Sequence, residues 1–330
     1  MREVAQACAV VVALLGSGLS SASGPAIERK HPRFDSLVPP DARLEEVAGG
    51  FEWVEGPLWS KSEGRLYLAD IPRNRVVFWS EATGVRPFLE RSGYTGAAAF
   101  TGREPGSNGM TFDRDGRLVI CQHGDRRIVR LEKDGTRTVL ADRFEGKRLN
   151  SPNDAVFRAN GDLYFTDPPF GLPRTFDDPQ KDLSFQGVYR VTPNGRVTLL
   201  TKELRAPNGI VFAPSEKTLY VANADAARPV YMAYDVRGDG TLGPGRVFFD
   251  ASEWAKTDKG LPDGMKVDVA GNLFAAGPGG LHVFAPDGTH LGTFRTGRLT
   301  SNCGWGGDGR DLFITADKVL YRVRLTTRGF

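Results

Sequence analysis

The stretch "RAPNGIVFAP", residues 205–214, contains the Asn208-Gly209 dipeptide, a pair that commonly forms the tight turn of a β-hairpin. A hairpin turn joins two strands, but this dipeptide stands at the start of a single apolar run and directly after Pro207. If this were the only such stretch, an ordinary turn would be the favoured interpretation of the Asn-Gly pair. Similar stretches recur along the chain, however, and their register gives Asn208 a different meaning.

Six segments share one pattern, in which a turn is followed by a leucine, an apolar run and a break. These leucines are Leu66, Leu118, Leu163, Leu219, Leu273 and Leu312, spaced 52, 45, 56, 54 and 39 residues apart. The apolar runs are short, rich in β-branched and aromatic residues, and bounded by Gly, Pro and Asp, with almost no helical periodicity. Repeats of this length with several short strands are typical of β-propeller blades.

Ten or eleven residues before each leucine stands a carboxylate or a carboxamide. The six positions are Glu55, Asn108, Asn153, Asn208, Asp263 and Asn302. The first strand of a propeller blade runs along the central channel, so six copies of one position should form a polar ring around it. We therefore predict an all-β fold, a six-bladed β-propeller over residues 43–330, with a central metal-binding channel.

The returning strand of each blade is antiparallel to the first and should end at the same mouth as the ring. Asp167 is expected at this end, with His123 beside the equivalent position of the second blade. The final blade is one strand short in sequence. We predict that residues 42–48, "ARLEEVA", supply it and so hide two exposed sheet edges.

The first 24 residues have Arg2, an apolar run and then small residues, which is the plan of a secretory signal peptide. We therefore expect export to the periplasm or the medium, without stable membrane insertion, because the run is too short to span a bilayer. Residues 25–42 are proline-rich and polar and are expected to form an extended lead-in without its own core. After cleavage, Cys121 and Cys303 remain, and they either pair or stay free.

The formal charge of +3 is small for 330 residues and argues against nucleic-acid binding, which usually needs a clustered basic face. Carboxylate and amide oxygens of the ring suit Ca²⁺ better than a transition metal, although another divalent cation would also fit. There is no HExxH motif and no Cys/His cluster for zinc. The alternative is a ring of hydrogen-bonded amides around a water-filled tunnel.

The chain resembles the gluconolactonase branch of the SMP-30/gluconolactonase/LRE family over about residues 43–330. The motifs that carry the resemblance include "EGPLW", "QHGDRRI", "GKRLNSPNDAVF", "GDLYFTDPPFGL", "PNGIVFAPSEKTLYVAN", "LPDGMKVDVAGNLF" and "SNCGWGGDGRDLFITA". The resemblance implies a six-bladed propeller with a divalent metal, usually calcium, in the channel.

By motif, the resemblance implies four metal ligands, which are Glu55, Asn153, Asn208 and Asp263. It leaves Asn108 and Asn302 to contact the substrate or to support the ligands. Animal members of the family have an arginine two residues before the second ligand, where it contacts the sugar. This chain has Ser151 there, as bacterial members do, so its recognition of the sugar must differ in detail. Ser151 and Asp167, which is expected at the mouth of the channel, are further candidates for substrate binding.

The implied activity is calcium-dependent hydrolysis of a small sugar lactone by attack of water on its carbonyl group. A GxSxG nucleophile motif is absent, which favours direct water attack. The candidate general bases are Asp263, then His123, then Asp167. Two alternatives stay open: a related metal-dependent esterase or phosphotriesterase-like hydrolase, and a non-catalytic propeller used as a binding module. Nothing in the sequence indicates a protein partner.

Overall fold

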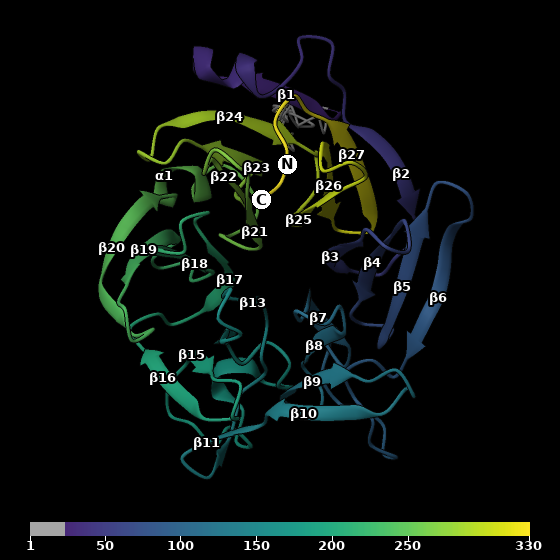
Figure 1. Cartoon of the computed structure of the whole chain (residues 1–330), viewed down its shortest axis with the longest axis vertical. Helices are drawn as coiled ribbons and strands as arrows, with labels where there is room; N and C mark the ends of the chain where they lie inside the picture. The colour runs from purple at the N-terminus through teal and green to yellow at the C-terminus, as the bar shows by residue number, and fades with distance from the viewer. Residues whose placement is uncertain (1–23) are drawn as a thin grey trace, which may run out of the picture.

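The computed structural model describes residues 24–330, so the predicted signal peptide lies outside the described residues apart from Gly24. Six antiparallel sheets of four or five strands are arranged as blades in a ring (Figure 1). In each blade the first strand lies nearest the centre of the ring and the last lies at the periphery. The predicted six-bladed β-propeller is therefore confirmed.

The blades follow one another along the chain. The first three consist of β3 (Val54–Ser60), β4 (Arg65–Asp70), β5 (Arg75–Ser80) and β6 (Gly84–Glu90); β7 (Ser107–Phe112), β8 (Leu118–Gln122), β9 (Arg127–Leu131) and β10 (Arg137–Ala141); and β13 (Ala155–Phe157), β14 (Leu163–Asp167), β15 (Gly187–Val191) and β16 (Val197–Thr201). The next two consist of β17 (Pro207–Phe212), β18 (Thr218–Asn223), β19 (Val230–Val236) and β20 (Leu242–Asp250); and β21 (Met265–Val267), β22 (Leu273–Gly277), β23 (Gly280–Phe284) and β24 (His290–Arg295). The sixth consists of β25 (Thr300–Gly306), β26 (Asp311–Ala316) and β27 (Val319–Arg324), completed by β2 (Glu45–Gly49).

The repeated leucines begin or nearly begin the second strand of each blade, and all six are buried. These strands are covered on both faces by neighbouring blades, which is why their sequences are continuous apolar runs instead of alternating ones. Between the sixth and first blades, the Phe313 ring stacks on the Trp59 ring with 6.0 Å between ring centroids. It also packs against the Trp79 ring, with 5.4 Å between centroids. The hydrophobic core therefore lies between blades, and it leaves the axis to the inner strands.

The ring is closed by the N-terminal strand β2, which pairs antiparallel with β27 as the outer strand of the sixth blade. Glu45 lies opposite Arg322, and their side chains form an ion pair of 2.9 Å. The predicted closure by residues 42–48 is confirmed, with the strand itself at Glu45–Gly49. The two ends of the chain thus share one sheet, and the outer edge of β27 is covered.

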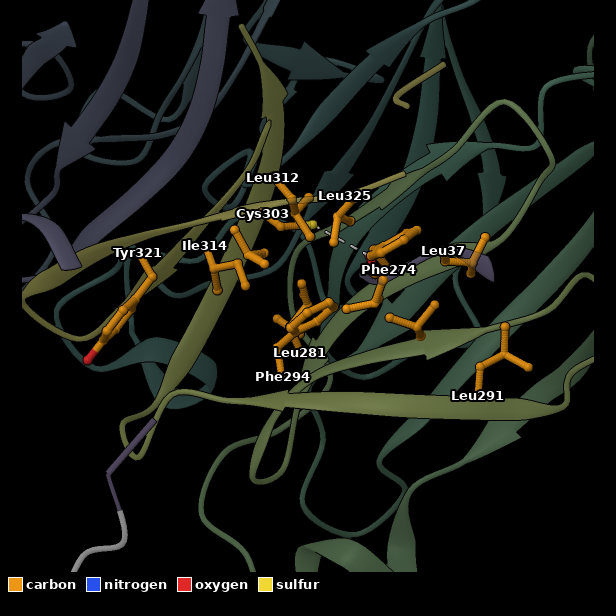
Figure 2. Packing of buried hydrophobic residues seen from close by; sticks show 14 of the residues in the cluster. Leu37, Phe274, Leu281, Leu291, Phe294, Cys303, Leu312, Ile314, Tyr321 and Leu325 are labelled. Atoms are coloured by element: carbon orange, nitrogen blue, oxygen red, sulfur yellow. Dashed lines mark hydrogen bonds between the residues drawn. The ribbon is translucent and has the colours of Figure 1, made fainter. Parts of the chain in front are cut away.

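The lead-in also packs onto the propeller. Strand β1 (Ala26–Arg29) pairs with β24 as a fifth strand of the fifth blade, and the 3-10 helix η1 (Pro32–Ser36) follows it. Phe34, Leu37 and Val38 are buried in the core shared by the fifth and sixth blades. Figure 2 shows Leu37 among the side chains of that cluster. The lead-in has no core of its own, and it covers the outer edge of β24.

Both cysteines in the described residues are buried and free. Cys121 belongs to a cluster between the second and third blades, whereas Cys303 lies in the cluster of Figure 2. The Cys303 thiol donates to the carbonyl oxygen of Phe274 across 3.7 Å, the dashed contact in Figure 2. Of the two alternatives left open by the sequence, the structure therefore shows free thiols.

The remaining elements are short. They are the two-stranded sheet β11 (Arg143–Phe144) and β12 (Lys147–Arg148), the 3-10 helix η2 (Thr175–Asp177) and the helix α1 (Ser252–Ala255). Within residues 24–330, no helix has the length and apolar character needed to cross a membrane.

Candidate metal and active site

The Asn208-Gly209 pair lies inside the inner strand β17, not in a hairpin turn. Pairing of β17 with β18 shifts register between Pro207 and Ile210, so the strand is irregular at Asn208. The same irregularity occurs between Glu55 and Leu58 in the first blade. It recurs at Ser107/Met110 and at Thr300/Asn302. Such bulges re-aim side chains next to functional sites, and here they lie at the positions of the polar ring.

The glycine that follows most ring residues is required by the close approach of the next blade. A Cβ atom on Gly209 would overlap the carbonyl oxygen of Asp263 and lie 2.8 Å from the Cα of Gly264. A Cβ atom on Gly109 would lie 2.6 Å from the carbonyl oxygen of Asn153. Each glycine therefore lets the backbone of one ring residue touch that of the next, which keeps the ring narrow.

Replacing Gly209 by alanine should destabilise the protein by about 1–3 kcal/mol, the usual cost of overpacking, because the obstructing atoms are backbone. It should also displace Asp263. Gly238→Ala is the matched control, since Gly238 has open space around it and an ordinary φ. Denaturant unfolding of both variants measures the difference. Equal stability of the two variants would contradict this account of the ring.

Five of the six ring residues line one cavity of about 410 Å³ at the mouth of the channel. These are Glu55, Asn108, Asn153, Asn208 and Asp263. The sixth, Asn302, is 3% exposed and donates from Nδ2 to Oε2 of Glu55 at 2.9 Å. The Gly56 amide donates to the same oxygen at 2.7 Å. Glu55 is thus held in place by its neighbours, with the other four side chains beside it.

Three buried carboxylates meet at this part of the channel. Burial raises the pKa of Glu55 to about 7, and the nearby Asp154 carboxylate adds to the rise. Burial also raises the pKa of Asp263 well above its usual range, with further contributions from Glu55, Asp154 and Glu104. One oxygen of Asp154 has no hydrogen-bond partner among the described residues. Concentrated negative charge of this kind is costly unless a cation compensates it.

The donor set fits a hard divalent cation. Carboxylate and amide oxygens from different blades face one cavity, and Ca²⁺ accepts six to eight such oxygens together with water. In the described part of the chain, no three His, Cys, Asp or Glu side chains cluster so as to hold a metal alone. The amide oxygens of Asn153 and Asn208 would therefore have to complete the shell around Glu55 and Asp263.

Two predicted substrate contacts, Ser151 and Asp167, are not among the residues that line this cavity. Both are fully buried. The Ser151 hydroxyl donates to the carbonyl oxygen of Pro168 at 2.6 Å and accepts from the Gly171 amide at 2.9 Å. Ser151 therefore fixes the "DPPFG" loop, whose Phe170 does reach the cavity.

Asp167 has the same backbone-holding role as its equivalents in other blades. Its Oδ2 accepts from the Asn150 amide at 2.8 Å, just as Asp70 accepts from the Glu52 amide and Asn223 from the Ala206 amide, both at 3.0 Å. Each of these bonds holds the loop that enters an inner strand. Burial raises the pKa of Asp167 to about 7. The structure thus gives Asp167 a loop-holding contact instead of a place on the cavity wall.

His123, the second candidate base, is 0% exposed, and the cavity wall in front of it is formed by Glu104. Nδ1 of His123 lies 2.9 Å from Oε2 of Glu104. The sequence prediction missed Glu104, because it lies in the irregular segment between β6 and β7. Its position could have indicated a role in the site, because Glu104 lies four residues before the ring residue Asn108. A loop that leads into an inner strand at this point must run past the mouth of the channel.

The apolar part of the cavity wall is formed by Trp53, Phe170, Leu261 and Leu299. They also come from loops or strand entries at the mouth of the ring. A concave site with apolar walls and a few convergent polar groups is the usual form of a small-molecule site.

Comparison with known proteins gives a consistent result. A family model described as "SMP-30/Gluconolactonase/LRE-like region" matches residues 53–318. A gluconolactonase from Zymomonas mobilis is 39% identical over 312 residues, covering 92% of this chain and 87% of that protein. A pentonolactonase from Haloferax volcanii is 29% identical over 269 residues, covering 79% and 80%. The solved structure of a gluconolactonase from Xanthomonas campestris superposes with a TM-score of 0.79 at 33% identity, covering 92% of this chain and 96% of that one. This chain belongs to the SMP-30/gluconolactonase/LRE-like family.

Proposed function

We propose that this protein hydrolyses a sugar lactone with the help of a divalent cation, most simply Ca²⁺, bound at the mouth of the channel. The observation that carries the proposal is the convergence of Glu55, Asn153, Asn208 and Asp263 on one cavity. Membership of a lactonase family supports the same reaction class, as do relatives that are named for six-carbon and five-carbon lactones.

The residues of the cavity divide into groups with different tasks. Four oxygen donors would hold the cation, which when bound would polarise the carbonyl group and stabilise negative charge on its oxygen. Asn302 keeps Glu55 in place through its hydrogen bond. The Asn108 amide faces the cavity and can hydrogen-bond a substrate hydroxyl or carbonyl group. Trp53 and Phe170 can pack against the carbon face of the lactone and exclude bulk water.

Turnover of glucono-1,5-lactone by the purified protein, followed by the release of acid, tests the proposal directly. We expect saturable hydrolysis well above the spontaneous rate, and slower or absent hydrolysis of a phosphotriester such as paraoxon. Hydrolysis of the phosphotriester alone would favour the related hydrolase, because both reactions can use the same oxygen-ligated cation. Absence of both activities in calcium-saturated protein would contradict a catalytic role.

A further inference from the structure

A carboxylate outside the ring, Glu104, lies on the wall of the same cavity. It belongs to residues 91–106, the segment between β6 and β7, and hydrogen bonds fix that segment at both ends. Oδ1 of Asn74 accepts from the amides of Gly93 at 2.8 Å and Tyr94 at 3.1 Å. The Gly106 amide donates to the carbonyl oxygen of Ile71 at 3.0 Å. The backbone of the segment that contains Glu104 is therefore fixed at both ends. The Glu104 side chain is 32% exposed and lines the cavity.

The second blade locks His123 directly behind Glu104. The His123 amide donates to the carbonyl oxygen of Gly106 at 3.1 Å, which ties the "QHGD" turn to the Glu104 segment. Gly124 packs so closely that a Cβ atom there would lie 2.6 Å from the carbonyl oxygen of Pro105. On the other side, a Cβ atom on Gly171 would lie 2.6 Å from the Cβ of His123. The imidazole is thus held between two loops.

The imidazole has an unusual environment for a buried ring. Nδ1 lies 2.9 Å from Oε2 of Glu104, but neither ring nitrogen makes a well-aligned hydrogen bond within the described residues. A buried polar ring without a partner is costly, so such a ring requires an explanation. A small rotation of the partly exposed Glu104 carboxylate would align it with the Nδ1–H group. The ring would then fix the direction of that carboxylate in the cavity.

The three carboxylates that line the cavity are not equivalent. Glu55 and Asp263 belong to the ring and would be ligands, so a bound cation would occupy their lone pairs and reduce their basicity. Glu104 enters from a loop and is not part of the ring. Its Oε2 atom faces His123, and because it lines the cavity without belonging to the ring, its carboxylate would stay free of the cation and available to a water molecule. A general base must lie within hydrogen-bonding distance of the attacking water and must have a free lone pair to accept its proton.

We propose that Glu104 is the general base of this site and that His123 is its positioning residue. The inference rests on the proposed lactone hydrolysis. Glu104 takes one proton from the attacking water while the water oxygen bonds to the carbonyl carbon. The bond between that carbon and the ring oxygen then breaks, and the proton passes from Glu104 to the departing ring oxygen. Water and lactone thus give the open hydroxy acid, and Glu104 is regenerated.

Glu104→Gln tests the role of Glu104, because it keeps the shape of the side chain and removes its basicity. We expect kcat at saturating calcium to fall by roughly a hundredfold or more, the usual scale for a general base, while KM stays within about twofold. Calcium binding should weaken somewhat as well, because the Glu104 charge acts on Asp263, so kcat is compared at full calcium occupancy. Glu90→Gln, at an exposed carboxylate on the outer strand β6, is the matched control and should behave as wild type.

A rise in KM with kcat retained would overturn the proposal and make Glu104 a substrate-hydroxyl acceptor. Unchanged kinetics would also overturn it. Calorimetric binding of the non-hydrolysable glucono-1,5-lactam gives a second measurement, which should not change in Glu104→Gln. These outcomes differ from a failure of the proposed function, because in that case the wild-type protein itself would not hydrolyse the lactone.

His123 is tested by a pair of substitutions and a double mutant. Asn can place an N–H group close to the position of Nδ1, whereas Leu cannot, so His123→Asn should retain several-fold more kcat than His123→Leu at similar KM. If His123 acts only through Glu104, the double variant Glu104→Gln/His123→Asn should be no slower than Glu104→Gln alone. Additive losses would overturn the positioning role, and this comparison needs no stable Leu variant.

Discussion

Removing the divalent cation should reduce lactone hydrolysis to its spontaneous rate, and added Ca²⁺ should restore it. A bound cation would polarise the lactone carbonyl group, and it would also offset the repulsion among the buried carboxylates of Glu55, Asp154 and Asp263, which contributes to the raised pKa values of Glu55 and Asp263. Unfolding temperature should fall on chelation as well, since a ligand that binds only the folded state contributes about 2.7 kcal/mol at one hundred times its dissociation constant. Activity and differential scanning calorimetry, each with and without chelator, measure both effects.

The same carboxylates make the effect of calcium dependent on pH. Without metal, folded Glu55 keeps its proton up to a pKa of about 7, whereas the unfolded chain loses it near the ordinary glutamate pKa of 4.5. The folded state therefore binds more protons between these values, and the stability of the metal-free protein should fall as pH rises through this window. Calcium requires the deprotonated carboxylate, so its affinity should fall as pH drops below about 7. The calcium-induced shift in unfolding temperature should thus be larger at pH 8 than at pH 5.

Two asparagines provide a matched pair for the metal prediction. Asn208→Ala removes a cavity amide and should weaken calcium binding, whereas Asn194→Ala removes an exposed turn amide and should not. Calcium titration by calorimetry separates the two variants. Full activity in protein shown by elemental analysis to lack divalent metal would contradict the proposed role of the ring.

The repeat made the architecture predictable from sequence. A leucine at the start of each second strand and a polar residue about ten positions earlier were enough to place Asn208 on an inner strand, because blade geometry repeats around one axis. Closure by β2 was also predictable, since the last blade lacked a strand and residues 42–48 lacked a blade. These are properties of regular pairing, and the sequence period carries them directly.

Loop contacts were not predictable in the same way. Glu104 and Phe170 reach the cavity from segments without periodicity, so their direction depends on contacts between different blades. Ser151 was expected to contact the sugar, but its hydroxyl is used by the neighbouring loop. The lead-in gave no sign that Phe34 would enter the core, because a single aromatic residue among prolines and charges forms no pattern.

The glycine that follows Asn208 is a second feature whose role could not be predicted from the sequence. In sequence, Asn208-Gly209 indicates conformational freedom for a turn. In the structure, Gly209 has no positive φ, and its lack of a side chain matters because Asp263 of the next blade lies against it. A contact between residues 54 positions apart cannot be seen in the local pattern that suggested the turn.

Asp263→Asn should cause the steepest dependence of activity on calcium among the site variants. Asn keeps an oxygen toward the cation but removes one of the two charges expected to ligate it. Breaking a buried charge pair costs about 3–5 kcal/mol, which corresponds to roughly a hundredfold or more in affinity. At about ten times the calcium dissociation constant of the wild type, occupancy of the variant and with it turnover should therefore fall by roughly tenfold or more.

Saturating calcium then separates the two candidate bases. Burial raises the pKa of Asp263 well above its usual range, as a base requires, but a cation on the same carboxylate opposes that rise. If Glu104 takes the proton, Asp263→Asn should recover most of its turnover at high calcium, whereas Glu104→Gln should recover none. If Asp263 takes the proton, the order reverses, and no calcium concentration restores Asp263→Asn. Turnover of both variants across one calcium titration, with occupancy measured by calorimetry, therefore identifies the carboxylate that accepts the proton from water.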